Sequence, residues 1–324
     1  MNLQTVPLGK TVTRIRRVRY GRQFRVYAER LGLGDDAIRR ATKLLKGLLD
    51  RRQIARRRRA AKELLLAVEP KFRVPEKTGF VPLDTSWFPE LSEVVAACRD
   101  IYEREAPKYD LDDPRNQFRN SLFTRENLEA HPVILRFALD RRVVAPVAAY
   151  LGTIPNLVSL QLWWTPKNDT TEGSQLYHLD RADYRLLKYF VNINDVDETS
   201  GPFTFLPADV STKVAATLVP EYDRKTDEEI FARARPQDSI ALSGRPGSGA
   251  VVDSCRCYHY GGRARGGERI VLMLQFQKYN CILESADTWW YRTAKVIQLP
   301  DGIDHELARM VLDLPPSIYG DRTK

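Results

Sequence analysis

Apolar residues recur at helical spacing in the first part of the chain. They recur every three or four positions after two aspartates, at Ile38, Ala41, Leu44, Leu45, Leu48 and Leu49. This spacing predicts a helix within residues 35–68, long or broken near Gly47. In residues 51–59 arginines point to every side, so we expect no continuous apolar stripe there. Three prolines, Pro70, Pro75 and Pro82, predict the end of the helical segment.

The pattern changes from helical to β-type after Gly152. Residues 89–106 and 124–151 have helical spacing, which predicts one helix in the first segment and one or two in the second. Short β-type segments then follow, separated by turn signals, at residues 157–165, 175–180, 186–193, 201–206, 239–242, 250–253, 256–260 and 268–278. Since no helix of crossover length lies between them, we expect an antiparallel sandwich or barrel rather than a parallel sheet.

Composition narrows the class of protein. The chain has 324 residues, of which 43% are apolar, enough for one large core or two ordinary ones. No apolar run approaches the roughly 20 residues that span a bilayer, so an integral membrane protein is not expected. The first twenty residues do not resemble a secretory signal, and the four cysteines include no CxxC pair. We expect a cytoplasmic protein with reduced thiols.

The net charge of +9 is unevenly distributed. Residues 1–65 carry +14 and the rest of the chain −5. This basic arm is interpreted in three ways: a helix that is solvated or packed on the protein, a docking segment for an anionic membrane surface through residues 1–68, or a segment that binds nucleic acid through its phosphates. The arginine cluster has no interleaved aromatic residues and fits no DNA-binding motif, which argues against sequence-specific nucleic-acid binding.

Metal-binding chemistry is indicated by histidine spacing. His178 and Asp180 lie two apart in a β-type segment, so their side chains leave the same face, and His259 lies in a second such segment. Two histidines and one carboxylate on one side of a metal are typical of non-haem Fe(II) oxygenases. Arg269 lies in an apolar strand, where a guanidinium needs a carboxylate partner, and 2-oxoglutarate provides one.

These motifs resemble the phytanoyl-CoA dioxygenase family of Fe(II)/2-oxoglutarate oxygenases over about residues 79–280. The matching segments are Tyr177-His-Leu-Asp180, residues 194–202 (Asn-Asp-Val-Asp-Glu-Thr-Ser-Gly-Pro), Tyr258-His-Tyr-Gly261 and Arg269. The resemblance implies a double-stranded β-helix, or jelly roll, preceded by helices. It implies that His178, Asp180 and His259 hold Fe(II), and that Arg269 anchors 2-oxoglutarate, with Gln161 beside it.

The same resemblance implies hydroxylation, or a related oxidation, of a C–H bond with O2 and release of succinate and CO2. Trp163 shares a strand face with Gln161, and Arg181 and Arg185 follow the His-x-Asp pair, so we expect these residues near an anionic substrate that is small or linked to a carrier or lipid. Two alternatives stay open: a jelly-roll binding module with a vestigial metal site, and a lipid-sugar hydroxylase of the envelope docked on the inner face of a membrane.

Other candidates are assigned structural roles. Cys255 and Cys257 are poorly spaced to complete a zinc site with His259, and we expect them to be small buried residues. His131 and His305 are expected to be structural. We expect three regions: a basic arm at residues 1–78, the oxygenase domain at 79–285 and a C-terminal extension at 286–324. The sequence identifies neither the substrate nor the oligomeric state.

Overall fold

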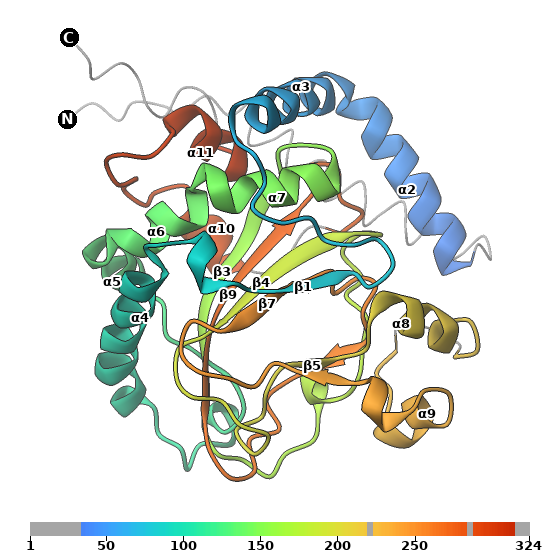
Figure 1. The fold of residues 1–324 in the computed structure, drawn as a ribbon, viewed down its shortest axis with the longest axis vertical. Helices are drawn as coiled ribbons and strands as arrows, with labels where there is room; N and C mark the ends of the chain where they lie inside the picture. Colours follow the sequence, from blue (N-terminus) through green and yellow to red (C-terminus); the bar gives the residue numbers. More distant parts are fainter. Residues whose placement is uncertain (1–33, 219–222, 284–287, 315–324) are drawn as a thin grey trace, which may run out of the picture.

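The structure is a computed structural model that describes residues 34–218, 223–283 and 288–314. Two β-sheets face each other, and most helices cover the outer side of the larger sheet (Figure 1). No helix in these ranges combines the length and the hydropathy that crossing a bilayer requires. The first 33 residues of the predicted basic arm lie outside the described ranges.

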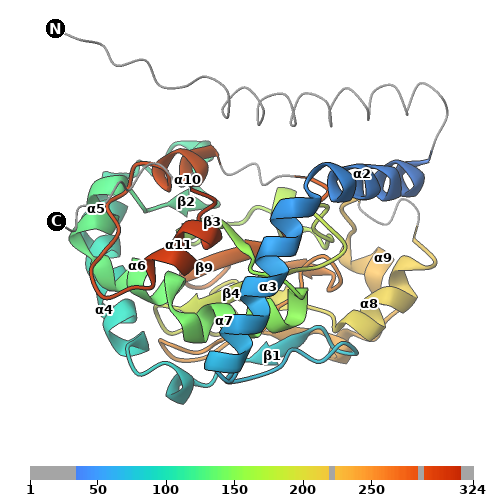
Figure 2. The same cartoon turned by 90° about the horizontal axis from the view of Figure 1, so that it is seen from above.

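The N-terminal helical segment consists of α2 (Asp35–Leu49) and α3 (Arg51–Ala67), with the break at Asp50. Residues 51–59 have no continuous apolar stripe, as predicted, because only Ile54 and Arg57 are buried among them. Ile54, Ala61 and Leu64 are buried on one face of α3, and Arg57 completes that face. The Arg57 guanidinium is buried because it donates hydrogen bonds to the carbonyls of Ile154 (3.2 Å) and Met310 (2.7 Å). Helix α3 therefore packs against α7 (Arg141–Leu151), as Figure 2 shows.

Helices precede the sheets as predicted, but residues 124–151 form three helices rather than one or two. The helices are α4 (Leu91–Glu105), α5 (Arg125–Ala130), α6 (Pro132–Leu139) and α7. Helix α5 begins with a capping box in which Thr124 and Asn127 bond reciprocally. Helix α7 ends at Gly152, whose left-handed backbone (φ 70°) favours glycine.

The larger sheet has the strand order β1-β7-β4-β9-β3-β2, and every neighbouring pair is antiparallel. Its long central strands are β3 (Asn156–Thr165), β4 (Leu186–Asn192) and β9 (Arg269–Gln277), and β7 (Gly249–Val252) is shorter. The edges are β1 (Phe80–Pro82) and β2 (Asn120–Ser121). These central strands lie at the positions that the alternating pattern predicts.

The smaller sheet has the order β6-β5-β8. These strands, β5 (Thr204–Phe205), β6 (Ile240–Ala241) and β8 (His259–Tyr260), are two residues each. His178 adds a fourth chain segment at its edge through an antiparallel bridge to His259. Along the chain, the strands go back and forth between the two sheets in the manner of an eight-stranded jelly roll. The predicted fold class is confirmed by this topology.

Alternation in β9 separates two environments. Ile270, Leu272 and Leu274 belong to the main core beneath the helices, whereas Val271 and Met273 face the smaller sheet and pack with its aromatic residues. By the same alternation Arg269, Gln275 and Gln277 lie on the face between the sheets. The fold thus places polar side chains inside the jelly roll.

The remaining helices are α8 (Ala208–Ala215), α9 (Asp227–Phe231), α10 (Thr288–Thr293) and α11 (His305–Val311). Trp290 of α10 is buried, and its Nε1 donates to the Leu157 carbonyl at 2.9 Å. Residues of α3 and α11 share the main core with the sheet. The division of the chain at residues 78 and 285 stays a prediction.

Candidate metal centre between the sheets

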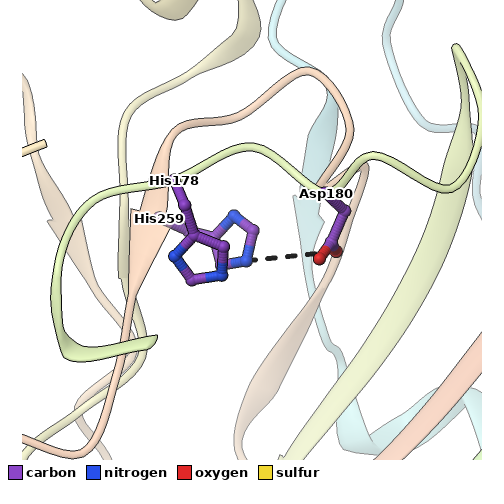
Figure 3. A group of neighbouring side chains, drawn as sticks. All are labelled: His178, Asp180 and His259. Carbon is purple, nitrogen blue, oxygen red and sulfur yellow. Dashed lines mark ion pairs between the residues drawn. The ribbon is translucent and has the colours of Figure 1, made fainter. Parts of the chain in front are cut away.

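His178, Asp180 and His259 lie together between the two sheets. One ligand atom from each lies within 4.8 Å of the others. The backbones of His178 and His259 exchange two N–H···O bonds of 3.0 Å, and the Asp180 N–H donates to the Ser254 carbonyl at 2.9 Å. This pairing brings the rings side by side, with their centroids 4.3 Å apart, and they face the Asp180 carboxylate (Figure 3).

Both imidazoles are oriented by backbone carbonyls. Nδ1 of His178 lies 2.9 Å from the Leu176 oxygen, and Nδ1 of His259 lies 2.9 Å from the Cys257 oxygen. Because a carbonyl only accepts, each Nδ1 carries the proton and each Nε2 keeps its lone pair. Burial lowers the pKa of both rings, and for His259 the nearby His178 adds to the effect. Neutral imidazoles with free Nε2 atoms are the form that binds metals.

Asp180 is held as a carboxylate. Burial opposes its ionisation, but Lys188, His259 and His178 together keep its pKa well below the ordinary value. Its Oδ2 lies 2.6 Å from Nζ of Lys188, accepts a hydrogen bond from Oγ of Ser254, and lies 4.0 Å from Nε2 of His259. Sequence reasoning missed Lys188 and Ser254. The signal for Lys188 was a lysine inside the otherwise apolar run Leu186–Asn192 of β4.

Within the described residues this is the one group of three histidine, cysteine or acidic side chains that could hold a metal ion. Two neutral nitrogens and one carboxylate oxygen are the donor set of non-haem Fe(II) sites, and they leave further coordination positions to other ligands. The residues present therefore fit a divalent iron ion.

Arg269 begins β9 on the inner face, opposite Thr165. Its guanidinium is buried, and its Nε and Nη1 have no hydrogen-bond partner in the structure. Burial and the neighbouring Arg119 lower its pKa to about 10, so it is still a cation at neutral pH. A Cβ on Gly261 would lie 2.9 Å from its Nη1, so glycine leaves the guanidinium room there. A buried cation with unused donors fits an anionic ligand.

Gln161 and Trp163 lie on the inner face of β3, opposite Met273 and Val271. Gln161 is buried, and its Oε1 accepts a 2.5 Å hydrogen bond from Ser121. The Trp163 ring lies 4.4 Å from the guanidinium carbon of Arg119. Both side chains therefore lie on the same sheet face as Arg269.

The arginines after the His-x-Asp pair are placed differently. Arg185 forms a 2.6 Å ion pair with Glu76, and its guanidinium lies over the Tyr150 ring. Arg181 is exposed, and its carbonyl accepts from Arg39 of α2. A substrate role for Arg181 and Arg185 stays a prediction.

Cys255, Cys257 and His131 behave as expected for structural residues, whereas His305 is exposed and its structural role stays a prediction. Cys255 and Cys257 are buried, and burial raises the pKa of both thiols. His131 links two helices, with Nε2 2.6 Å from Oδ2 of Asp100 and Nδ1 2.8 Å from the Asn127 oxygen.

Comparison with known proteins gives similarity to solved structures only, since no family model and no curated protein matches the chain. EctD from S. alaskensis, solved with 2-oxoglutarate and 5-hydroxyectoine, is 15% identical with a TM-score of 0.42, covering 63% of this chain and 73% of EctD. The epimerase SnoN, in complex with Fe3+, alpha ketoglutarate and nogalamycin RO, is 15% identical with a TM-score of 0.40, covering 82% and 93%.

HygX from Streptomyces hygroscopicus, with nickel and 2-oxoglutarate bound, is 15% identical with a TM-score of 0.39, covering 63% of this chain and 84% of HygX. All three TM-scores are below 0.5. The assignment of the jelly roll therefore rests on the strand order and registers of this chain, and the assignment of the site rests on its own donor atoms.

Proposed function

We propose that this protein is an Fe(II)- and 2-oxoglutarate-dependent dioxygenase that oxidises an unactivated C–H bond and releases succinate and CO2. The proposal is carried by one juxtaposition. Two neutral imidazoles and a charged carboxylate meet between the sheets. On the inner face of the larger sheet lies the buried guanidinium of Arg269, whose Nε and Nη1 have no hydrogen-bond partner.

Nε2 of His178, Nε2 of His259 and an oxygen of Asp180 would hold the iron. When bound, iron and 2-oxoglutarate supply the oxidising chemistry from O2, which needs no general base from the protein. The side chains of this protein then have to hold the metal ligands and the bound molecules in position. The Leu176 and Cys257 carbonyls fix the two rings, and Ser254 orients Asp180.

Arg269 would bind the far carboxylate of 2-oxoglutarate, because its planar fork matches a carboxylate and its donors are otherwise unused. Aromatic residues line the side of the site next to His259. The Phe203 ring lies 5.1 Å from that of His259 and stacks on Phe190 at 4.0 Å. Such a wall would protect the oxidising chemistry from side reactions.

The test is succinate formation from 2-oxoglutarate, which should require Fe(II) and O2. We expect His178→Ala to lose this activity, and the exposed His305→Ala to keep it as the matched control. Circular dichroism checks that both variants are folded. Full activity in His178→Ala would contradict the proposal. Binding of iron and 2-oxoglutarate without succinate formation would favour the alternative of a binding module.

A second proposal concerns docking on an anionic membrane surface. Helix α2 attaches to the body through its cations: Lys43 pairs with Asp183 at 2.5 Å, and Lys46 donates to the Cys281 carbonyl at 2.8 Å. Its leucines face outward instead, with Leu44 70% and Leu48 72% exposed, and Leu45 and Leu49 are also exposed. After the buried Asp50, the exposed Arg51 and Arg52 follow the leucines along the chain.

Outward leucines beside cations favour the interface of an anionic bilayer. We expect the protein to sediment with vesicles of phosphatidylcholine and phosphatidylglycerol, and less with phosphatidylcholine alone. The double variant Leu44→Gln/Leu48→Gln should lose binding. Leu66→Gln, which changes a leucine 90% exposed on α3, is the control and should keep it. A smaller particle size in gel filtration for the double variant, with no vesicle binding by the wild type, would indicate self-association instead.

A further inference from the structure

The inner face of the larger sheet carries a second buried cation besides Arg269. Lys188 of β4 lies opposite Gln275 of β9 and Val252 of β7, and it is 9% exposed. It shares this face with Phe190, which packs between the two sheets. Its ammonium ends 2.6 Å from Oδ2 of Asp180. The lysine therefore reaches the candidate metal centre from the opposite sheet.

The two cations stand at different levels of the sheet. Arg269 is the first residue of β9, whereas Lys188 lies opposite Gln275, six residues further along that strand. At about 3.3 Å per residue, the backbone of Arg269 lies roughly 20 Å along β9 from Gln275, the residue opposite Lys188. Arg269 is accounted for by the far carboxylate of 2-oxoglutarate under the proposed function. Lys188 is not.

The charged groups that the triad and the strands β4 and β9 contribute, summed with Fe(II) and 2-oxoglutarate, give an excess of one positive charge. The triad and the long strands β4 and β9 together contribute three charged side chains, those of Asp180, Lys188 and Arg269. A divalent iron ion and a 2-oxoglutarate dianion cancel, so the loaded site keeps a net charge of about +1. One more anion would balance the site.

A metal ion on Asp180 changes what Lys188 can do. A dication bound to Oδ2 repels an ammonium that lies 2.6 Å from the same oxygen. The four-carbon stem and rotatable donors of lysine allow the ammonium to turn to another acceptor. We propose that Lys188 binds an anionic oxygen group of the substrate, and that Asp180 holds it in place until the metal arrives. This inference rests on the proposed function and adds the substrate class to it.

The first experiment measures Mn(II) affinity with the full-length protein, using the metal alone as probe. Since Lys188 competes with the metal for Asp180, we expect Lys188→Met and Lys188→Gln to bind Mn(II) roughly tenfold more tightly than the wild type. The half-buried Lys278→Met is the matched control and should not change affinity. Thermal unfolding shows which variants are folded. Unchanged or weaker Mn(II) binding in both Lys188 variants would overturn the inference that Lys188 competes with the metal for Asp180.

The second experiment titrates the protein loaded with Mn(II) and 2-oxoglutarate, using acetate as the carboxylate probe and sulfate as the tetrahedral oxyanion probe. We expect saturable binding of at least one anion, at least tenfold weaker in Lys188→Met and retained in Lys188→Arg and Lys278→Met. The preferred anion indicates whether the substrate carries a carboxylate or a phosphate-like group. No saturable binding in the wild type, or equal binding in Lys188→Met, would overturn the inference. Failure of the wild type to bind Mn(II) and 2-oxoglutarate would instead contradict the proposed function.

Discussion

Replacing Arg269 by methionine should weaken 2-oxoglutarate binding while leaving the ligand-free protein at least as stable. A buried arginine normally stabilises through its partners, but Nε and Nη1 of Arg269 have none. Methionine keeps an unbranched chain of similar length and removes the charge. The two effects therefore have opposite signs, which a merely structural arginine would not produce.

The expected gain in stability follows from the burial of the Arg269 guanidinium. The pKa of Arg269 is lowered from 12.5 to about 10. At 1.36 kcal/mol per pKa unit, holding the charged form in the folded protein costs about 3 kcal/mol. Part of this returns as stability in Arg269→Met, so we expect a gain of roughly 1–3 kcal/mol. On the binding side, two charge-assisted hydrogen bonds of about 1.5–3 kcal/mol each are lost, so the Kd should rise by roughly a hundredfold or more.

Thermal unfolding with Mn(II), with and without 2-oxoglutarate, measures both effects. We expect 2-oxoglutarate to raise the Tm of the wild type but not of Arg269→Met, whose ligand-free Tm should be equal or higher. Arg263→Met is the comparison, because Arg263 is paired with Asp227 at 2.7 and 2.8 Å and lies over the Tyr260 ring. It should lose stability and keep the response to 2-oxoglutarate. The reasoning is refuted if Arg269→Met is strongly destabilised and still responds to 2-oxoglutarate.

Three further predictions follow from the same geometry. Gly261→Ala places a Cβ 2.9 Å from Nη1 of Arg269. Calorimetry should therefore show roughly tenfold weaker 2-oxoglutarate binding and an unchanged Mn(II) affinity. Equal weakening of 2-oxoglutarate and Mn(II) binding would contradict this prediction. Burial raises the pKa of Asp253 to about 7, so below that pH the folded state holds a proton that the unfolded state has lost. Wild-type stability should therefore fall by roughly 3 kcal/mol between pH 5 and 8. Urea unfolding at these two pH values should show that Asp253→Asn lacks this dependence. Chelation of a divalent metal held at a hundredfold excess over its Kd should remove about 2.7 kcal/mol of stability from the wild type and nothing from His178→Ala, as measured by denaturant unfolding.

The sequence pattern was sufficient for the four central strands of the larger sheet but gave no sign of its short edge strands β1 and β2. Its long strands β3, β4 and β9 alternate or stay apolar over seven or more residues, so their positions follow from local periodicity. The smaller sheet was harder, because β5, β6 and β8 are two residues each and His178 joins by an isolated bridge. Strand pairs of only two residues are determined by tertiary packing, and two residues are too few to show a periodic pattern in the sequence.

The candidate triad could be predicted because i, i+2 spacing in an extended segment places His178 and Asp180 on one face, even though that segment forms only isolated bridges. Its surroundings could not. Ser254 reaches Asp180 from 74 residues away, and Lys188 reaches it from the opposite sheet. Arg57 shows the same limit, since a cation in an arginine run is buried by carbonyls 97 and 253 residues distant. Such contacts depend on where the fold brings carbonyls and carboxylates, which residue type and spacing do not encode.

The central claim is that His178, Asp180 and His259 hold iron while Arg269 holds 2-oxoglutarate beside it. Anaerobic addition of Fe(II) and then 2-oxoglutarate, followed by visible absorption, tests this claim most directly. The account predicts a weak charge-transfer band that needs both additions in the wild type and does not form in His178→Ala. No band in the wild type at saturating iron and 2-oxoglutarate, or an equal band in His178→Ala, would contradict it.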